Sequence, residues 1–419
     1  MSNKFKMTRR DFAKTAAIAT FAVITKDAVS AEKNIDTLKI GLIGCGGRGF
    51  GAVKDCLNGN DNVVVVALAD TFEDKLKACR HKLETMKRTD PKCAKKIDIK
   101  DDHCFVGLDA WKKILQTDID IVIHATPPYC RPEHIEAAVE AGKHIFTEKP
   151  IAVDPVGVKR FMKAVEKAKE KGLCFATGTQ RRSSNAYRET VKKIQDGAIG
   201  EIIAARVYWN GSLPFCHERK PGWSDLEYRL RNWYNQIWTC GDNIVEQHIH
   251  NIDVINWIMG THPVKVVASG GRAWKPREEK YGDLWDHFEC DFEYPNGVHM
   301  FSFSRHWNNS KEDVFEEVFG TKGKSRCNDM GKDTISPYEQ EHIDLVRAIR
   351  NEIPYLNTGM ETAISTMTAI MGRISAYTGQ EITWDDVMKS NLSIVPEELD
   401  WSKPYPIGPI PVPGETKFE

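Results

Sequence analysis

The sequence has no surplus of charge of either sign, because 58 lysines and arginines balance 59 aspartates and glutamates in a chain of 419 residues. Nucleic-acid-binding proteins carry a basic patch, so this balance argues against such a partner. No apolar run reaches the about 20 residues that a membrane-spanning helix needs. No internal repeat or low-complexity tract is present. These absences indicate a globular protein without a membrane span or a nucleic-acid partner.

The chain also has no C-x-x-C pair, although it contains 11 cysteines. An odd number of cysteines without such pairs fits neither a disulfide framework nor a zinc knuckle. Buried free thiols are compatible with a protein that folds in the reducing cytoplasm. We therefore predict neither a disulfide framework nor a metal site.

The beginning of the chain reads as an export signal, predicted over residues 1–31. "TRRDFAK" carries a twin arginine before an apolar run, and Val29 and Ala31 are small residues at the spacing that signal peptidase accepts. A twin-arginine signal is read by the pathway that carries folded proteins, so it predicts a periplasmic location. The alternative is an ordinary amphipathic N-terminal helix.

"TLKIGLIGCGGRGFG" combines a short apolar strand, a glycine turn and the start of a helix. Gly44, Gly46 and Gly49 form the pattern G-x-G-x-x-G. In a dinucleotide-binding fold the first glycine permits the tight turn, and the second lets the backbone approach the pyrophosphate. The third lets the helix pack closely on the strand. The pattern alone is weak evidence, because chance matches are common.

A second apolar run, "VVVVALAD", ends in Asp70, 21 residues after Gly49. A carboxylate at this distance can accept hydrogen bonds from both ribose hydroxyls and would repel a 2′-phosphate. No arginine occurs in the following "TFEDKLK", so we predict NAD rather than NADP as the cofactor. The alternative is that Asp70 caps the next helix.

Strand-like and helical segments alternate through the first half of the chain, which predicts a Rossmann domain with a doubly wound parallel sheet over residues 36–152. "IDIVIHATPP" and "HIFTEKP" are strands that end in turns. Ligands of such sheets lie beyond the carboxyl ends of the strands. This places Thr126, Pro127, Glu148 and Lys149 at the mouth of the cofactor site.

After residue 152 several strand-like runs follow with few intervening helices. Asn296-Gly297, between the last two runs, is a hairpin signal. We predict an α+β substrate-binding domain with a mostly antiparallel sheet over residues 153–395. The Pro-rich ending, 396–419, is predicted to be an extended arm that lies on the body or on a partner.

"CGDNIVEQHIHNIDVINWIMG" is predicted to be one helix that Asp242 caps and Gly260 ends. At about 100° per residue, Glu246, His250 and Asp253 share one face, away from an apolar stripe. A carboxylate four residues from a histidine can orient it and raise its pKa, so His250 is a candidate proton-transfer group.

Two alternatives remain for this polar face. One is a metal site with His248 as the third ligand, although His248 points about 160° away from His250. The other is a buried His–Glu pair that only supports packing.

The motifs "GLIGCGGRG", "ATPP", "PEHIEAAVEAGKHIFTEKP", "GTQRR" and "HIHNIDVINWIMG" occur in this order. Together they resemble the Gfo/Idh/MocA family of NAD(P)-dependent sugar and cyclitol oxidoreductases, over most of the mature chain. The resemblance implies that Lys149 lies beside the nicotinamide and hydrogen-bonds the reacting hydroxyl. It also implies a homo-oligomer, either a dimer or a tetramer. The family's usual pattern is Asp-x3-His-x2-Asp, and here Glu246 occupies its first position. The extra methylene of glutamate shifts the carboxylate, which could change the sugar carbon that faces the nicotinamide.

In this interpretation a carbinol carbon loses a hydride while its hydroxyl loses a proton. His250 is the expected proton acceptor, positioned by Glu246, and Lys149 stabilises the developing alkoxide. Gln180 and Arg182 in "GTQRRSS", together with Asp253, are the predicted substrate contacts, although an ion pair explains Arg182 equally well.

Four aromatic residues, Tyr208, Trp209, Trp233 and Tyr234, could offer a sugar a stacking surface. At strand and helix spacing, however, aromatic residues are more often part of the core.

An exported enzyme must carry its nicotinamide cofactor with it, because such cofactors are made in the cytoplasm. We therefore expect non-dissociating NAD(H) whose redox state is restored in place. Two reaction classes meet this condition: hydride transfer to or from a sugar, glycoside or cyclitol, and redox-neutral glycoside hydrolysis by oxidation, elimination and reduction. The second resembles the NAD-dependent N-acetylgalactosaminidases, which replace the Glu148-Lys149-Pro150 tripeptide retained here, so the oxidoreductase is favoured. A cofactor-bound sensor without turnover is a third alternative.

Overall fold

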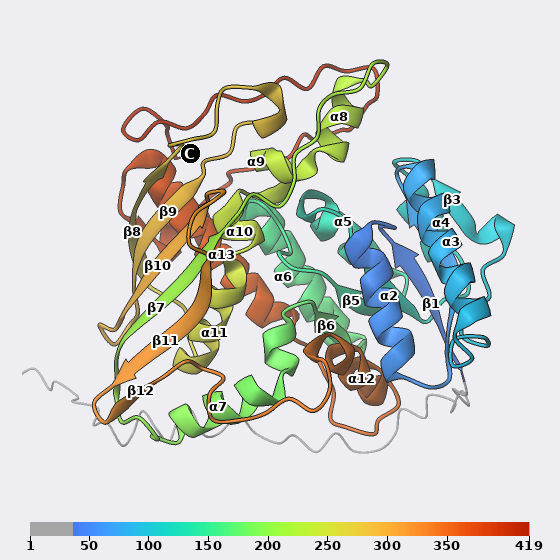
Figure 1. Cartoon of the computed structure of the whole chain (residues 1–419), viewed down its shortest axis with the longest axis horizontal. Helices are drawn as coiled ribbons and strands as arrows, with labels where there is room; N and C mark the ends of the chain where they lie inside the picture. Colours follow the sequence, from blue (N-terminus) through green and yellow to red (C-terminus); the bar gives the residue numbers. More distant parts are fainter. Residues whose placement is uncertain (1–36, 419) are drawn as a thin grey trace, which may run out of the picture. The chain divides into compact units, whose positions relative to one another are not determined.

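The structure is a computed structural model and describes residues 37–418, so the predicted export signal lies outside the described residues. This part of the chain contains two β-sheets with helices packed against them (Figure 1). One sheet is parallel and the other is mostly antiparallel, so the predicted fold class is confirmed. Between residues 37 and 418 no helix has the length and apolarity needed to cross a membrane.

The first sheet has six parallel strands in the order β3-β2-β1-β4-β5-β6. Chain order reverses between β1 and β4, and ligands of such sheets bind in the crevice that forms at this point. The strands are β1 Leu38–Ile43, β2 Val63–Asp70, β3 Cys104–Val106, β4 Ile121–His124, β5 His144–Thr147 and β6 Phe175–Thr177.

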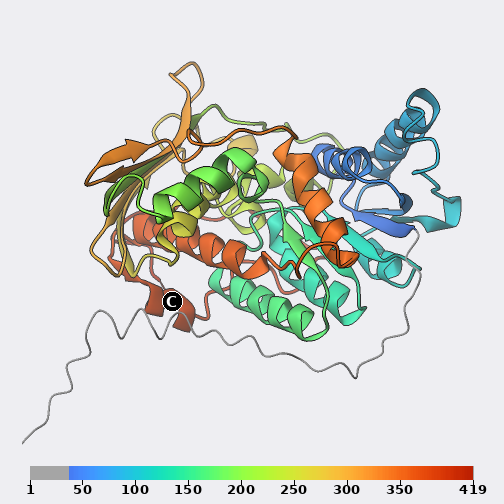
Figure 2. The ribbon, with the colours of Figure 1, turned by 90° about the horizontal axis from the view of Figure 1, so that it is seen from below.

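Helices bury both faces of this sheet, as a doubly wound fold requires. Three pack on one face and three on the other, in two separate apolar clusters. The first three are α2 Gly47–Gly59, α3 Glu73–Thr89 and α12 Pro337–Ile349, and the others are α4 Ala110–Leu115, α5 Arg131–Glu140 and α6 Pro155–Glu170. Although α12 comes from late in the chain, it lies beside α2 (Figure 2).

The parallel sheet continues beyond the boundary predicted at residue 152. Its last strand, β6, pairs with β5 from Ile145 opposite Phe175 to Thr147 opposite Thr177. The segment "LCFATGTQ" has the composition of a strand, but nothing in it indicates which sheet it joins. The nucleotide-binding unit therefore also contains chain assigned to the second domain.

The second sheet has seven strands in the order β12-β11-β7-β10-β9-β8-β13. Only β7 and β10 pair in parallel, and the predicted Asn296-Gly297 hairpin joins β9 to β10, with a φ of 78° at Gly297. The strands are β7 Ile202–Gly211, β8 Lys265–Gly271, β9 His287–Glu293, β10 His299–His306, β11 Asp313–Gly320, β12 Gly323–Ser325 and β13 Ile382–Thr383.

Helices α11 and α13 cover one face of this sheet and share its apolar cluster. The helices of this half are α7 Asn185–Gln195, α8 Asp225–Arg231, α9 Ile237–Cys240, α10 Asn243–Glu246, α11 Ile249–Met259, α13 Gly359–Thr378 and α14 Trp384–Lys389. All 11 cysteines are free thiols.

The C-terminal arm lies on the body of the chain and contains neither helix nor strand from residue 396 to 418. Tyr405 is buried in a third apolar cluster with Leu226 and Leu230. Trp285 donates from Nε1 to the carbonyl oxygen of Pro411, 3.2 Å away. The arm is therefore anchored to the body at Tyr405 and Pro411.

Candidate active site

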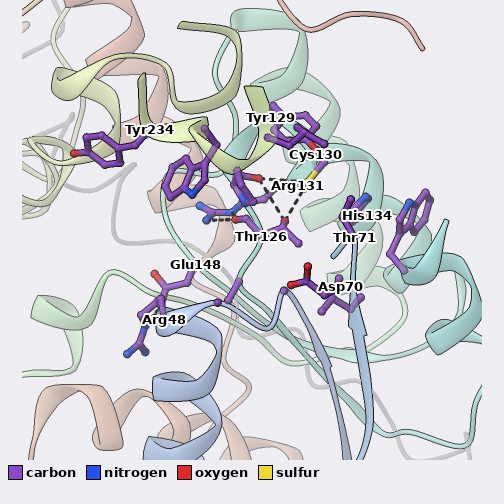
Figure 3. Close-up of a pocket in the computed structure, with 18 of the residues that line it drawn as sticks. Arg48, Asp70, Thr71, Thr126, Tyr129, Cys130, Arg131, His134, Glu148 and Tyr234 are labelled. Carbon is purple, nitrogen blue, oxygen red and sulfur yellow. Dashed lines mark hydrogen bonds and ion pairs between the residues drawn. The ribbon is translucent and has the colours of Figure 1, made fainter. Parts of the chain in front are cut away.

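A cavity of about 1050 Å³ lies beyond the carboxyl ends of the parallel strands. One side is formed by the turn after β1 and by the ends of β2, β4 and β5, and the other by β7, α10, α11 and the segment between β7 and α9. Figure 3 shows Asp70 and His134 towards one end of this cavity and Tyr234 towards the other. Cavities for small ligands are commonly about 300–1,000 Å³, so this one has room for a large ligand.

The three glycines of the turn differ in what surrounds them. Gly44 has a φ of 96°, and a Cβ there would lie 2.7 Å from the carbonyl carbon of Ala125. A Cβ at Gly49 would lie 1.9 Å from the carbonyl oxygen of Gly44, which locks α2 against the turn. At Gly46 a Cβ would meet nothing within 4 Å, and this residue is the N-cap of α2, which has no side-chain cap. The N-terminus of α2 is thus open towards the cavity.

Asp70 ends β2 and lines the cavity. Its two carboxylate oxygens accept hydrogen bonds from the backbone N–H of Cys45, at 2.7 Å, and of Phe72, at 2.8 Å. Phe72 occupies the cap position of α3, and no side chain caps that helix, so the alternative role for Asp70 is wrong. Burial raises the pKa of the carboxyl.

Thr126, Pro127 and Glu148 also line the cavity, at the ends of β4 and β5. The Thr126 carbonyl oxygen is held by Arg131 Nε at 2.9 Å. Glu148 Oε1 accepts from Arg48 Nε at 2.5 Å. The ends of the neighbouring strands β4 and β5 therefore form one side of the cavity.

Lys149 pairs with Glu246 across the cavity wall. Its Nζ donates to the main-chain carbonyl oxygen of Glu246 at 2.6 Å and lies 3.2 Å from Oε1 of the same residue. Both side chains are buried, and Oε2 of Glu246 has no hydrogen-bond partner among the described residues. Burial raises the pKa of Glu246, although the charge of Lys149 opposes the shift.

The helix predicted around His250 is broken into two. α10 ends at Glu246, and α11 begins at Ile249. Because of the break, the His250 N–H donates to the carbonyl oxygen of Gln247 at 3.3 Å instead of to that of Glu246. The predicted ends are correct, since Asp242 accepts from the Asn243 N–H and Gly260 is left-handed.

His250 lines the cavity, but Glu246 does not orient it as predicted. Its ring stacks on that of Trp209, with centroids 5.8 Å apart and planes at 23°. Nδ1 has no hydrogen-bond partner in the described part of the chain. Burial and the positive charges of Lys149 and Arg181 hold the pKa of His250 well below its usual range, opposite to the predicted direction. The lowered pKa favours the neutral imidazole, and its buried Nδ1 is available to a hydrogen-bonding group of a ligand.

The three predicted substrate contacts divide into two groups. Gln180 lines the cavity and donates from Nε2 to the Tyr338 hydroxyl at 3.1 Å. Arg182 and Asp253 form a buried bidentate ion pair, with distances of 2.7 and 2.9 Å, and neither lines the cavity. Their geometry favours the ion-pair alternative.

His248 points away from the cavity, and its Nε2 lies 2.7 Å from the Ser302 hydroxyl. Between residues 37 and 418 no group of three histidine, cysteine, aspartate or glutamate side chains could hold a metal ion.

Sequence reasoning missed several residues that line the cavity. Arg48 binds Glu148, and its Nη2 lies 3.5 Å from Oε1 of Glu341. Because Arg48 lies inside the glycine motif, the sequence could have indicated that it lines the cavity. Phe215 belongs to an irregular segment without periodicity, and Arg231 comes from α8, on the second domain. No pattern in the sequence brings these last two residues to the cavity.

The glycine turn, the strand-terminal carboxylate and the crevice beyond the parallel strands are the features of a dinucleotide-binding site. The chain matches the oxidoreductase family with an NAD-binding Rossmann fold over residues 38–179, and the GFO/IDH/MocA C-terminal domain over residues 187–326. It belongs to the Gfo/Idh/MocA family, as the sequence motifs predict.

Two curated relatives illustrate the range of this family. The chain is 28% identical over 236 residues to 2,7-anhydro-N-acetylneuraminate hydratase of Escherichia coli, covering 54% of this chain and 59% of that protein. It is 24% identical over 303 residues to myo-inositol 2-dehydrogenase of Thermotoga maritima, covering 71% and 77% respectively. The match thus spans little more than half the length of the hydratase.

Solved structures share the fold. Scyllo-inositol dehydrogenase from Lactobacillus casei, solved with bound NAD(H) and scyllo-inositol, has a TM-score of 0.63 at 19% identity and covers 83% of this chain and 99% of that chain. Aldose-aldose oxidoreductase from Caulobacter crescentus has a TM-score of 0.64 at 17% identity, covering 83% and 99%.

The residues present fit NAD. The open N-terminus of α2 suits a pyrophosphate, which favours unpaired backbone N–H groups and the positive end of a helix dipole. Asp70 suits a ribose diol without a 2′-phosphate. The unpartnered Oε2 of Glu246 and Nδ1 of His250 are buried polar atoms that a bound ligand would satisfy.

Proposed function

We propose that this protein transfers a hydride between bound NAD(H) and a hydroxyl or carbonyl group of a sugar, glycoside or cyclitol. The observation that carries the proposal is that Lys149 and His250, from different domains, line the same cavity as the glycine turn and Asp70. NAD in this cavity supplies the hydride acceptor or donor. The chain supplies the groups that hold the substrate and manage its proton.

The roles of these groups follow from their charge and position. Lys149 is a buried cation whose ammonium can donate to a substrate oxygen and stabilise it as it becomes an alkoxide. Neutral His250 can accept the hydroxyl proton during oxidation and return it during reduction. Glu246 holds Lys149 in place by its carbonyl oxygen and carboxylate, so it acts as a positioning residue.

The direct test is to purify the protein without added cofactor and to look for bound nicotinamide by mass spectrometry and by absorbance near 340 nm. Sugars, glycosides and cyclitols are then added one at a time, and the change in this absorbance is followed in a single turnover. A reducible or oxidisable bound cofactor supports the proposal. Protein that carries no nicotinamide and gains none on incubation with NAD contradicts it.

Redox-neutral glycoside cleavage is the second candidate. Two of the curated relatives are named as hydratases, and hydration involves no net oxidation. The same lysine and histidine could support transient oxidation, elimination and reduction. Release of nitrophenol from 4-nitrophenyl glycosides, without external NAD and without a lasting change at 340 nm, would favour this candidate.

Several contacts support a non-dissociating cofactor. Residues 395–399 of the chain, before and at the start of the C-terminal arm, line the cavity near Phe72. Arg231 of α8 bonds Asp74 of α3 at 2.9 and 3.1 Å and lies 4.0 Å from the centre of the Phe72 ring. The arm is tied to α8 in turn, since Arg229 Nε donates to the Tyr405 carbonyl oxygen at 2.8 Å. We call α8 together with residues 395–405 the strap.

A strap that joins the domains beside Asp70 would slow release of the adenosine end of NAD. Such retention is what an enzyme exported with its cofactor requires, so it agrees with a twin-arginine signal and a periplasmic location. Fusion of residues 1–31 to a reporter that is active only after folded export would test the signal. Replacing Arg9 and Arg10 by lysine should then retain the reporter in the cytoplasm.

A homo-oligomer, dimer or tetramer, is part of the proposal. Val267 and Phe301 both lie beside Asp291 on the outer face of the second sheet, where they are exposed by 56% and 43%. Apolar side chains gathered on one sheet face are typical of an interface. Sedimentation of the protein and of a Val267→Lys, Phe301→Lys variant would test this, with dissociation as the expected result.

A further inference from the structure

The end of the cavity opposite Asp70 is lined by aromatic rings. Phe215 lies 5.9 Å from Trp233 and 5.3 Å from Tyr234, and the last two are 5.4 Å apart, measured between ring centroids. All three line the cavity, as does Trp209, which stacks on His250. This aromatic cluster of four residues therefore adjoins the group expected to transfer the proton.

These rings are only partly buried in the core. Trp209, Phe215 and Trp233 are half-buried, and only Tyr234 is fully buried. Tyr208 provides a contrast, because it packs between Phe303 and Phe315 and does not line the cavity. The aromatic cluster thus presents apolar ring surface to the cavity and is not simply part of the core.

Hydrogen bonds with two buried asparagine side chains fix the irregular segment that carries Phe215. Asn235 Nδ2 donates to the Phe215 carbonyl oxygen at 3.0 Å, and the Asn232 side-chain oxygen accepts from the His217 N–H at 2.9 Å. Both asparagines are fully buried. A loop held in this way offers its side chains in one conformation before any ligand arrives, which lowers the entropic cost of binding.

The position of the cluster separates it from the cofactor. The glycine turn and Asp70 mark where the adenosine and pyrophosphate fit, and Lys149 marks the reacting centre. Figure 3 places Tyr234 at the end of the pocket away from Asp70. Trp209, a member of the cluster, stacks on His250 with ring centroids 5.8 Å apart, so the cluster adjoins the reacting centre.

We propose that the aromatic cluster is a subsite for a second ring, joined by a glycosidic bond to the sugar that reacts at Lys149 and His250. The inference rests on the proposed function and specifies its substrate as a glycoside. Aromatic faces bind the apolar face of a pyranose or of an aryl group in the same way, and Gln247 and His217 line the same part of the cavity and can bond hydroxyls. A free monosaccharide would leave this surface without a partner.

The ligand-side experiment uses the protein with its bound cofactor and measures binding by calorimetry, so that it does not depend on turnover. Methyl, 4-nitrophenyl and glucosyl β-glycosides of glucose, galactose and N-acetylgalactosamine are compared as matched sets. For at least one sugar, the 4-nitrophenyl or the glucosyl member should bind at least tenfold more tightly than the methyl member. Preference for the glucosyl member identifies a second sugar ring, and preference for the nitrophenyl member identifies an aryl group. Equal affinities within every set, or no binding of any member, would overturn the proposal.

The protein-side experiment removes the rings. Phe215→Ala and Trp233→Leu should each reduce the gain in affinity from the second ring by at least threefold, and leave binding of the methyl glycoside within twofold of wild type. Asn235→Ala, which frees the loop, should act in the same direction. Tyr355→Ala is the matched control, because this exposed aromatic residue does not line the cavity.

The outcomes distinguish this subsite from the proposed function itself. If the cofactor is bound and reduced by a sugar, yet the variants bind both rings as wild type does, only the subsite is wrong. If no nicotinamide is bound at all, the proposed function fails first.

Discussion

The ammonium of Lys149 donates to the main-chain carbonyl oxygen of Glu246, 2.6 Å away. That oxygen is available because α10 ends at this residue, and the last carbonyls of a helix have no partner within it. The break in the helix thus serves the site, since an unbroken helix would use this oxygen for the His250 N–H. One hydrogen bond fixes the lysine at the end of β5 against the element that leads to His250.

We predict that Lys149→Met lowers the rate of hydride transfer about 10²–10³-fold, as expected for removal of one donor to a developing oxyanion. The variant should keep its bound NAD, because the glycine turn and Asp70 are unchanged. Single-turnover absorbance and mass spectrometry measure the two quantities separately.

Lys275→Met is the matched control for this variant. Lys275 is also a buried lysine that donates to a carbonyl oxygen, that of Trp285 at 2.8 Å, but it does not line the cavity. It should lower stability without changing the rate of hydride transfer. Full activity of Lys149→Met would show that the lysine does not stabilise the alkoxide.

Gly49→Ala should abolish NAD binding. The new Cβ would lie 1.9 Å from the carbonyl oxygen of Gly44, so α2 must move away from the turn that binds the pyrophosphate. Gly51→Ala, two residues further along the same helix, meets only the flexible Arg48 side chain at 3.2 Å. That control should retain NAD and gain up to about 1 kcal/mol of stability from helix propensity. The readout is the nicotinamide content of each purified variant, and equal contents would contradict the steric argument.

The nucleotide half of the site could be predicted from sequence because its signals are local. Gly44, Gly46 and Gly49 sit on one turn, and Asp70 ends the next strand, so a single βαβ unit brings them together. The break after Glu246 was not predicted, because the helical sequence pattern continues across it. Only a tertiary contact, the hydrogen bond from Lys149 to the Glu246 carbonyl oxygen, uses the break. Phe215 and Arg231 were missed for a related reason: their positions depend on how a loop and a short helix of one domain meet the other.

Arg231→Ala should accelerate release of NAD about threefold to thirtyfold. The substitution removes an ion pair with Asp74, worth about 0.2–1 kcal/mol at a partly exposed site, and a cation–π contact with Phe72, worth about 0.5–1 kcal/mol. Release is followed as loss of nicotinamide from the protein after dilution into cofactor-free buffer.

Arg160→Ala is the control for the strap. Arg160 pairs with Glu136 at 2.6 Å, and both side chains are 45% exposed, but the pair lies outside the cavity. It should release NAD at the wild-type rate. Identical release from wild type and Arg231→Ala would show that the strap does not retain the cofactor.

His342 should make the folded protein sensitive to acid. It is buried on α12 with its ring 4.2 Å from that of Phe146, and burial, with a smaller effect from Arg48, lowers its pKa to about 3. In the unfolded chain a histidine has a pKa of about 6.5. Below that pH the unfolded state binds a proton that the folded state does not, so stability is lost as the pH falls through 6.5.

His342→Gln removes this titration. Each pH unit below 6.5 costs the wild type about 1.4 kcal/mol through this group. Between pH 7 and pH 5 the wild-type free energy of unfolding should therefore fall by about 2 kcal/mol more than that of the variant. Urea unfolding at both pH values measures the difference. Parallel pH curves for wild type and His342→Gln would mean that His342 can be protonated in the folded state, and hence that the packing of α12 against β5 opens to water.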